Sequence, residues 1–329
     1  MTAIAPHITA FLREYLPLQR GVSAHTCDSY AYSFQLLFDY ASRQLETRPS
    51  ALELEQIDAK LVMDFLLHLQ SERSNSASTR NVRLAAIKSF MHFVEYRVPS
   101  LLEQSRRILA IPSKKTDQPL IRHLALEEMQ AILNAPDTQT RYGKRDRAML
   151  HVCFAAGLRV SELVSLSFNA LTWQPTPTLH IAGKGRRHRD LPLWKQAAED
   201  LRSWLAVRGD LPVPEVFVSS HRQAMTRIGF AYLLRKYVQR AAQTCPSLMA
   251  KKVSPHCLRH SCAMMIYQAT GDLRKVSLWL GHADIQTTEV YLRADPTEKL
   301  AAIEAVIPPS LRRGQFSAPD RLIAALRGQ

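Results

Sequence analysis

Apolar residues recur at three- and four-residue spacing through the first hundred residues of the chain, with polar residues between them. This spacing is typical of amphipathic helices, which bury one face and expose the other. It predicts four helices, over residues 6–19, 23–44, 58–72 and 76–97. Asp58 is the expected N-cap of the third helix, and Ser78 or Thr79 is expected to open the fourth. The segment 1–98 is therefore interpreted as a four-helix domain.

The fourth predicted helix has two distinct faces. Its expected core positions are Val82, Ala86, Phe90, Phe93 and Val94. The other face carries basic residues, and the second helix also opens with polar residues; the set is His25, Thr26, Arg80, Arg83 and Lys88. Outer faces of helices usually meet water, and the alternative is that these side chains grip the phosphates of a nucleic acid. Both interpretations stay open at this point.

The helical pattern breaks between residues 99 and 119, which contain three prolines among clustered polar residues. We interpret this stretch as an interdomain linker that is partly helical at its start. Its basic residues either follow a nucleic-acid backbone or keep the linker soluble. A second domain is expected over 120–308, and residues 309–329 look like an appended tail.

The second domain changes its period in the middle. Two helical segments come first, the second of which ends at Gly157, and a short helix follows. Residues 178–193 then alternate apolar and polar side chains around a glycine-containing turn, which predicts a β-hairpin. Helical spacing returns from residue 194 onward. The predicted fold class is mainly α with a small antiparallel β-sheet.

Composition narrows the class of protein. The chain has 329 residues, of which 46% are hydrophobic and 22% charged, enough for two domains with cores. It has neither an apolar run of roughly 20 residues nor a signal-peptide pattern, so we expect a cytoplasmic protein without a membrane partner. Its five cysteines are scattered, which argues against a disulfide framework. The net charge of +14 favours a polyanionic partner, although a basic, solvated surface would look the same.

Several basic residues stand where elements begin or end. Arg159 follows the glycine that ends a buried helix, and either forms an ion pair with Glu162, three residues on, or binds a phosphate while Glu162 holds its guanidinium. Lys184 sits between two glycines at the hairpin tip, as part of a solvated turn or reaching outward to a ligand.

The segment "SPHCLRHS" begins a further helix, with Ser254 as the expected cap and Pro255 at the first position. His256 and Arg259 share one face of this helix, and His260 borders it. A permanent cation beside a titratable imidazole suits an anion whose charge changes during a reaction. Four side chains also crowd here that could ligate zinc: His256, Cys257, His260 and Cys262. Ligands on one turn would face different directions, so we expect no metal site.

The segment "LGHADIQTTEVYLR" places His282 just after a helix ends at Gly281, and Tyr291 near the start of the next helix, with Thr287 as its expected cap. Taken alone, Tyr291 is most simply a packing residue. Two arginines, a lysine, two histidines and a tyrosine at element ends nevertheless suit phosphoryl transfer without a metal. Arginines would stabilise the phosphate, a lysine or histidine would handle protons, and the tyrosine would accept the phosphoryl group.

Four segments, in chain order, resemble the motifs of the tyrosine recombinase (phage integrase) family, close to its bacterial Xer-like branch. They are "AAGLRVSEL", "GKGRRHRDLPL", "SPHCLRHS" and "LWLGHADIQTTEVYL". The resemblance covers about residues 6 to 305. It implies a helical, SAM-like core-binding domain and an α+β catalytic domain that form a C-shaped clamp on double-stranded DNA. It also implies tetramers on two DNA sites, composed of this chain alone or with other recombinases, in which the C-terminal helix, here 295–306, often packs into a neighbouring protomer.

By the same resemblance, each candidate residue has an expected role. Arg159 and Arg259 would clamp the scissile phosphate, and Lys184 would protonate the leaving 5′ oxygen. His256 would assist proton transfer at the tyrosine, and His282 would hydrogen-bond the phosphate. Tyr291 would attack phosphorus to give a 3′-phosphotyrosyl link. The link conserves the bond energy, so no ATP, metal or other cofactor is implied.

Other functions are compatible with parts of this pattern. A type IB topoisomerase uses a similar set of residues, and a non-catalytic DNA-binding regulator could be built on the same fold. Within the recombinases, the role is integration or transposition of a mobile element, or resolution of chromosome or plasmid dimers. The tail after Pro308 departs from the housekeeping pattern, and on that ground we favour a mobile element.

Overall fold

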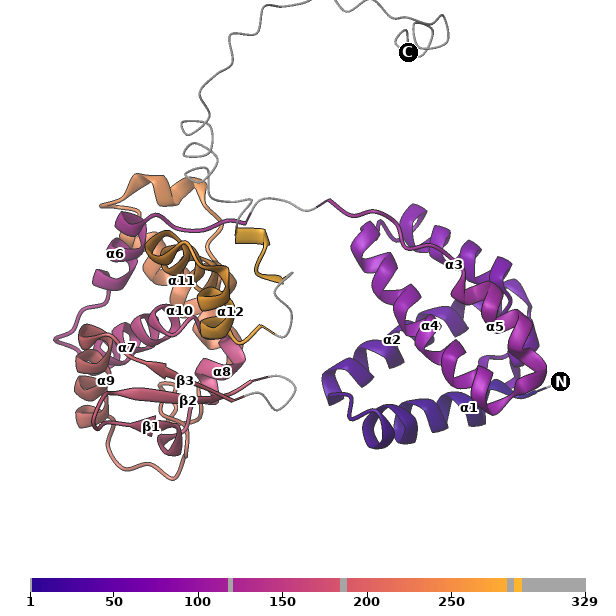
Figure 1. Cartoon of the computed structure of the whole chain (residues 1–329), viewed down its shortest axis with the longest axis horizontal. Helices are drawn as coiled ribbons and strands as arrows, with labels where there is room; N and C mark the ends of the chain where they lie inside the picture. The colour runs from indigo at the N-terminus through magenta and orange to yellow at the C-terminus, as the bar shows by residue number, and fades with distance from the viewer. Residues whose placement is uncertain (1, 118–120, 184–187, 283–286, 292–329) are drawn as a thin grey trace, which may run out of the picture. The chain divides into compact units, whose positions relative to one another are not determined.

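The computed structural model describes residues 2–117, 121–183, 188–282 and 287–291 (Figure 1). The chain divides into two compact units, Met1–Gln118 and Pro119–Gln329. The described residues are mainly helical with a small antiparallel sheet, which confirms the predicted fold class. None of the described helices is long and apolar enough to cross a membrane.

The first unit contains helices at the four predicted places. Its elements are α1 (Ile4–Ala10), which continues as the π-helical η1 (Phe11–Gln19), α2 (Ala24–Gln44), the 3₁₀ turns η2 (Pro49–Ala51) and η3 (Leu54–Gln56), α3 (Ala59–Ser71), α4 (Ala77–Arg97), η4 (Pro99–Leu101) and α5 (Leu102–Leu109). The core centres on aromatic rings. Phe11 packs against Phe34, Phe90 and Phe93, with ring centroids 5.3–6.0 Å apart.

The predicted cap of α3 is confirmed, and the predicted cap of α4 is wrong. Asp58 caps α3 by accepting a hydrogen bond from the Leu61 amide at 2.7 Å, as predicted. The cap of α4 is Ser76 rather than Ser78 or Thr79, and its hydroxyl accepts from the Thr79 amide. The helix therefore begins earlier than its first apolar residue suggested.

The core face of α4 was predicted incorrectly at Val82, which is 45% exposed. The face centred on Leu84, Ile87 and Met91 is buried because α4 contacts helices on three sides: α2, α3 and α5. A helix covered on several sides buries more than one apolar stripe, so periodicity alone does not locate its exposed side.

The stretch interpreted as a linker contributes to the first core. Leu101, Ile108 and Ile111 are buried together with the aromatic cluster. Gln104 Nε2 donates to the carbonyl oxygens of Leu54 and Ile57, at 2.7 and 2.9 Å. The first unit therefore extends through α5, beyond the predicted boundary at residue 98. The helix expected at the start of this stretch is present as α5, and its apolar side packs on the core of the first unit.

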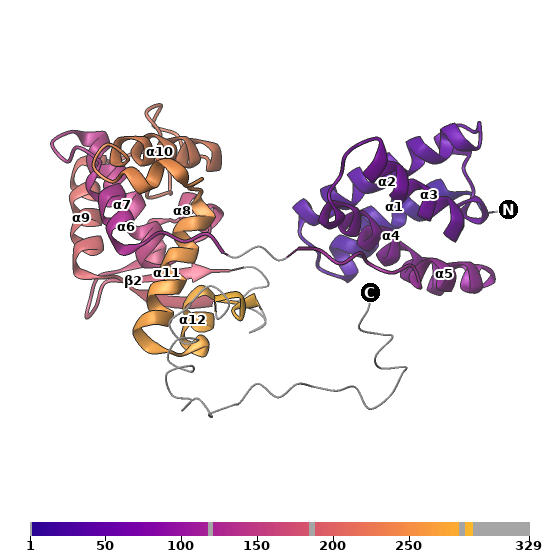
Figure 2. The same cartoon turned by 90° about the horizontal axis from the view of Figure 1, so that it is seen from above.

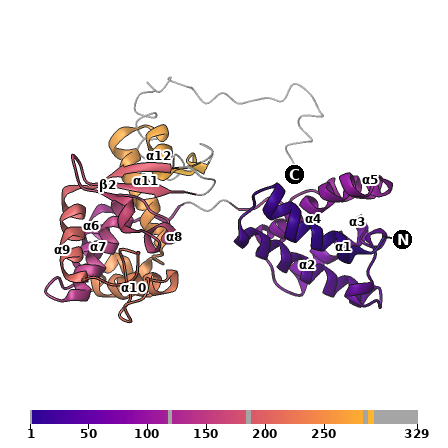
Figure 3. The same ribbon diagram turned by 90° about the horizontal axis from the view of Figure 1, so that it is seen from below.

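The second unit surrounds the central helix α7. Its elements are α6 (Leu126–Asn134), α7 (Arg141–Ala155), α8 (Val160–Val164), η5 (Phe168–Ala170), β1 (Leu171–Thr172), β2 (Thr178–Ala182), β3 (His188–Pro192), α9 (Lys195–Arg208), α10 (Arg227–Ala241), η6 (Pro246–Ala250), α11 (Pro255–Thr270) and α12 (Leu273–Leu280). Figures 2 and 3 show α7 between α10 and the sheet. The residues of α7 are buried from Ala148 to its end, as expected for an element covered on all sides.

In the described part of the chain, the three strands form one antiparallel sheet in the order β1-β2-β3. The predicted hairpin is β2 and β3, in which Leu179 pairs with Leu191 and Ile181 with Arg189. Side chains two apart on a strand share a face, so Arg189 lies on the same face as the buried Leu191. This register brings a guanidinium to the buried side of the hairpin.

Candidate active site

Arg159 occupies the turn between α7 and α8. Gly157 ends α7 with a positive φ of +56°, and a Cβ atom there would lie 2.8 Å from Leu280 Cδ2. Glycine at this position therefore lets α12 approach the end of α7. Arg159 follows as the N-cap residue of α8, with its side chain one-third exposed. Its guanidinium is accessible from solvent and attached to a rigid helix end.

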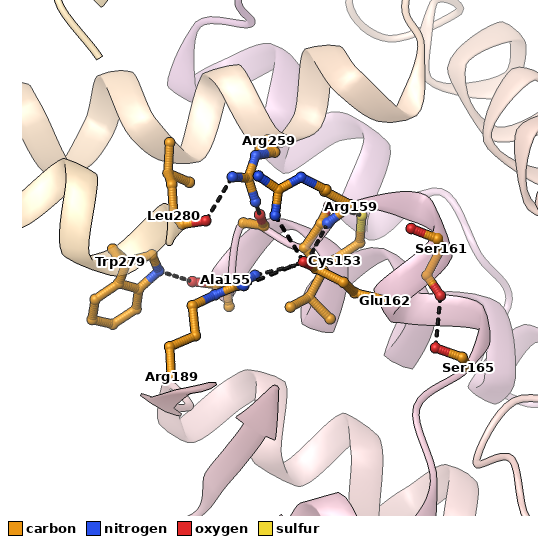
Figure 4. A network of polar contacts seen from close by, with 12 residues as sticks. Cys153, Ala155, Arg159, Ser161, Glu162, Ser165, Arg189, Arg259, Trp279 and Leu280 are labelled. Carbon is orange, nitrogen blue, oxygen red and sulfur yellow. Dashed lines mark hydrogen bonds and ion pairs between the residues drawn. The ribbon is translucent and has the colours of Figure 1, made fainter. Parts of the chain in front are cut away.

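Glu162 connects Arg159 to the hairpin (Figure 4). Its Oε2 accepts from the Arg159 amide at 2.9 Å, and its Oε1 accepts from Arg159 Nη1 at 2.8 Å. Arg189 donates to both oxygens, at 2.7 Å from Nη2 and 3.2 Å from Nη1. Burial by itself raises the pKa of the Glu162 carboxyl, but hydrogen bonds and charge from the two arginines outweigh it, and the pKa lies below its ordinary value.

The sequence analysis missed Arg189. Its side chain is only 8% exposed, and it pairs with a carboxylate that is 7% exposed. A signal was present, because the alternation in "HRDLPL" places Arg189 on the apolar face of β3 with Leu191. A charged residue on a buried face requires a partner, and Glu162 was the acid already expected to pair with an arginine.

Arg259 lies deep in the same region, 2% exposed on α11. Its Nη1 donates to the carbonyl oxygen of Gly157 at 2.5 Å, and its Nη2 to that of Leu280 at 2.7 Å. These carbonyls lie at the C-terminal ends of α7 and α12, where the helix dipoles favour a cation. Burial, followed by the charge of Arg159, lowers the pKa of Arg259 to about 10, so the group is still charged at neutral pH.

The start of α11 carries both histidines of the "SPHCLRHS" segment. Ser254 and Pro255 take the predicted cap and first positions. His256 is exposed, and its ring packs edge to face against that of His260 at 5.0 Å. His260 Nδ1 lies 2.9 Å from the hydroxyl of Tyr291. The residue in contact with the candidate nucleophile is thus the histidine to which no role was assigned.

Tyr291 is 1% exposed and packs with apolar residues of α11 and α12, among them Met264 and Leu280. Burial raises the pKa of its phenol to about 12, although the positive charge of Arg259 acts in the opposite direction. In this position the phenol is neutral and covered by protein. A phosphate can reach it only after the tyrosine or its covering moves.

His282 follows Gly281, which ends α12 with a φ of +64°. Its Nδ1 lies 2.8 Å from the hydroxyl of Thr288, which is fully buried. Burial, then the charges of Arg259 and Arg159, lower the pKa of His282 to about 4, so it is neutral at pH 7. The cap predicted at Thr287 stays a prediction, because the described residues of this segment end at Tyr291.

Some predicted residues cannot be compared with the structure, and others lie elsewhere than expected. Three of the predicted features lie outside the described residues: Lys184, the segment 295–306 and the tail 309–329.

The two thiols considered as zinc ligands face backbone carbonyls. Cys257 Sγ is 3.3 Å from Arg122 O, and Cys262 Sγ is 3.7 Å from Ala155 O. Among the described residues, no group of three His, Cys, Asp or Glu side chains could hold a metal ion.

The structure shows the contacts of the predicted DNA-gripping side chains within the first unit. Arg80 is 7% exposed, and its Nη1 donates to the carbonyl of Pro112 at 3.1 Å. Arg83 Nη1 donates to the Ser33 hydroxyl at 3.0 Å. Both guanidiniums therefore support contacts inside the unit, because α4 is covered where these residues emerge. Other members of the set lie toward solvent: His25 is exposed, and Thr26 and Lys88 are partly exposed.

Among the described residues, the charges around Arg159 do not cancel. Three guanidiniums, from Arg159, Arg189 and Arg259, surround one carboxylate, that of Glu162, which leaves a formal excess of three minus one, or two positive charges. A buried excess of positive charge is costly unless an anion joins it. The side chain of Arg159 is one-third exposed and His256 is exposed, so both can be reached from solvent.

Sequence comparisons show the family to which the chain belongs. Residues 122–298 match the phage integrase family, and residues 8–97 match the N-terminal SAM-like domain of phage integrases. The chain therefore belongs to the phage integrase family and is a tyrosine recombinase. It is 38% identical over 326 residues to y4rC of Sinorhizobium fredii (strain NBRC 101917 / NGR234), described as an integrase/recombinase, covering 98% of both proteins.

Two further comparisons place it among Xer-like proteins. It is 32% identical to the tyrosine recombinase XerC of Pelotomaculum thermopropionicum (strain DSM 13744 / JCM 10971 / SI), covering 87% of this chain and 92% of that protein. Among solved structures, XerH recombinase bound to difH substrate in a pre-cleavage complex is 25% identical, with a TM-score of 0.62 over 89% of this chain and 84% of that one. The resemblance to Xer-like recombinases is thereby confirmed.

Proposed function

We propose that Tyr291 is the nucleophile with which this recombinase cleaves and rejoins DNA, and that Arg159 and Arg259 bind the scissile phosphate. The observation that carries the proposal is the excess positive charge at the junction of α7, α8 and α11. The positive charge of Arg259 acts on the Tyr291 phenol and opposes the rise of its pKa by burial. Preorganised cations of this kind stabilise a phosphate that gains charge in the transition state.

The proposed reaction is the one that the resemblance to the family implies. Tyr291 Oη attacks phosphorus, the bond to the 5′ oxygen breaks, and a 3′-phosphotyrosyl link forms. Glu162 keeps Arg159 oriented, because it binds both the amide and the guanidinium of that residue. His282 completes the phosphate site, His256 assists proton transfer at the tyrosine, and Lys184 supplies the proton of the leaving oxygen. A 5′ hydroxyl of a second strand reverses the step.

A covalent-capture experiment tests the nucleophile. Duplexes with randomised sequence, each containing one nick, are incubated with the full chain and denatured in detergent, and duplexes that remain attached to protein are amplified. The selected duplex then serves as the probe for every variant. Wild type is expected to give a covalent adduct and Tyr291→Phe none. Tyr267→Phe, at another buried tyrosine of the same cluster, is the control that keeps the adduct.

An adduct formed by Tyr291→Phe would show that another group attacks phosphorus. Two rival functions have their own outcomes. Relaxation of a supercoiled plasmid that lacks the selected sequence would favour a type IB topoisomerase. Full biological activity of Arg159→Ala and Arg259→Ala would favour a non-catalytic DNA-binding regulator.

For the biological role, we propose integration or transposition of a mobile element by a cytoplasmic, DNA-associated enzyme. The support is the end-to-end similarity to a protein described as an integrase/recombinase. The alternative, dimer resolution, is supported by the similarity to XerC. A plasmid assay separates them: joining of an element to DNA without a matching second site favours integration, and exchange only between two identical sites favours resolution.

We further propose that the two units grip opposite sides of duplex DNA and that four protomers join two DNA sites.

An apolar pocket of about 610 Å³ supports the proposed tetramer. It lies between β3, α11 and α12 and is lined by side chains such as Trp194, Ile266 and Leu278. Its proposed occupant is the segment 295–306 of a second copy, which carries Leu300 and Ile303 at helical spacing. Leu278, 76% exposed, is the test position. Leu278→Glu should leave single-site DNA binding intact and prevent tetramers on the selected probe in light scattering.

A further inference from the structure

His260 contacts the reacting atom of the proposed nucleophile. Its Nδ1 lies 2.9 Å from Tyr291 Oη, and the two rings meet edge to face with centroids 5.8 Å apart. A neutral phenol has one proton to donate, and a neutral imidazole has one lone pair to accept it. In the tautomer of His260 that carries its proton on Nε2, Nδ1 accepts the hydrogen bond from the Tyr291 hydroxyl.

His256 has a different environment from His260, although both lie on α11. His256 is exposed, whereas His260 lies under it and contacts both the His256 ring and the Tyr291 ring. A general base must lie within about 2.6–3.2 Å of the proton-bearing atom. His260 fulfils this condition in the structure, and His256 is the residue that covers it.

We propose that His260 is a further catalytic residue, which accepts the proton of Tyr291 as the tyrosine attacks phosphorus. The proposal rests on Tyr291 being the nucleophile. The Oη–H bond breaks and the proton passes to His260 Nδ1, while Oη forms a bond to phosphorus. The bond from phosphorus to the 5′ oxygen breaks, and that oxygen takes a proton from the general acid, the role assigned to Lys184. In the reverse step, His260 returns its proton to the phenol.

Burial and nearby positive charges keep the His260 ring neutral, so that it can accept a proton. The groups whose charges face it are His256 and Arg259 on α11, His123 before α6, and His282 after α12. Burial, followed by the charges of His256, Arg259 and His123, lowers the pKa of His260 to about 4. The ring is therefore neutral at pH 7, with its lone pair available. The imidazolium formed in the step is compensated by the negative charge that develops on the phosphoryl group.

The test compares three variants by the rate of adduct formation in a single turnover on the selected nicked probe. His260→Asn places an amide oxygen near the position of Nδ1, so it keeps the hydrogen bond but cannot take the proton. His260→Phe removes both functions. His256→Asn, one turn away, is expected to slow the reaction at every pH without removing the fall in rate at acid pH. DNA binding is measured separately by fluorescence anisotropy, so that lost affinity is not mistaken for lost chemistry.

His260→Asn is expected to bind the probe like wild type and to form adduct at least about 100-fold more slowly at pH 7, the usual contribution of a general base. Its rate should rise with pH, because hydroxide then removes the phenolic proton. Wild type and His256→Asn should both lose activity as the pH falls through the pKa of His260, and His260→Asn should lack this limb of the profile.

Two outcomes would overturn the assignment without touching the proposed function. One is a His260→Asn rate within about 3-fold of wild type, well below a general-base effect. The other, independent of any variant at His260, comes from nitrogen NMR of free protein: the His260 Nδ1 resonance should be that of an unprotonated nitrogen and should shift in Tyr291→Phe. An unchanged resonance contradicts the hydrogen bond. Adduct formation by Tyr291→Phe would instead refute the proposed function.

Discussion

Replacing Glu162 by alanine removes the one carboxylate that Arg159 and Arg189 share. Four hydrogen bonds are lost, one from the Arg159 amide and three from guanidinium nitrogens. Arg159 can turn toward water because its side chain is one-third exposed. Arg189 cannot, because its side chain is 8% exposed and packs beside Gly281. The variant therefore leaves a buried cation without its partner.

The expected loss of stability follows from the burial of Arg189. Removing one partner of a buried ion pair lowers the free energy of unfolding by about 3–5 kcal/mol. A unit of this size loses roughly 2–4 °C of melting temperature per kcal/mol, so the expected decrease is roughly 6–20 °C. Asp190→Ala on the same strand is the control. Its ion pair with His180 joins side chains that are 70% and 44% exposed, and exposed pairs contribute about 0–1 kcal/mol.

Tryptophan fluorescence during urea unfolding measures both variants in the full chain. All four tryptophans, at positions 173, 194, 204 and 279, lie in the second unit, so the signal follows the unit that contains Glu162. The double variant Glu162→Ala/Arg189→Met should recover part of the loss, because it also removes the buried cation. A Glu162→Ala cost no larger than that of Asp190→Ala would refute the reasoning.

Two other predictions concern the same region. Gly281→Ala should lower the free energy of unfolding by about 1–3 kcal/mol from backbone strain, plus a clash with Arg189, whose Cδ would lie 3.1 Å from the new Cβ. Gly271→Ala, at φ +62° with nothing within 4 Å, measures the strain alone, and equal costs would contradict the clash. Because the pKa of Glu162 is lowered, its stabilising effect should be complete above the ordinary carboxyl pKa of about 4.3 and lost as the pH falls through its own pKa. Urea unfolding of wild type and Glu162→Gln should therefore converge at acid pH, and a constant difference would contradict the lowered pKa.

Local sequence determined much of the fold because helices and hairpins depend on residues close together in the chain. Apolar spacing located the helices of both units and the hairpin, and the caps at Asp58 and Ser254 were evident from the residues themselves. The ordered motifs from Arg159 to Tyr291 identified the recombinase family, which the comparisons confirm. Apolar spacing did not predict that Val82 of α4 is exposed or that α5 packs on the first core, because distant segments cover these helices.

The tertiary structure decided which of these residues meet. Arg189 joins Glu162 of α8 across 27 positions, and Tyr291 meets His260 of α11 across 31. Likewise, the guanidinium of Arg80 donates to the carbonyl oxygen of Pro112, a contact that joins residues 32 positions apart. The sequence by itself determined the chemical groups and their order. Only the packed structure decided which cation is buried, which histidine touches the phenol, and which partner each charge has, because those contacts join segments that are remote in the chain.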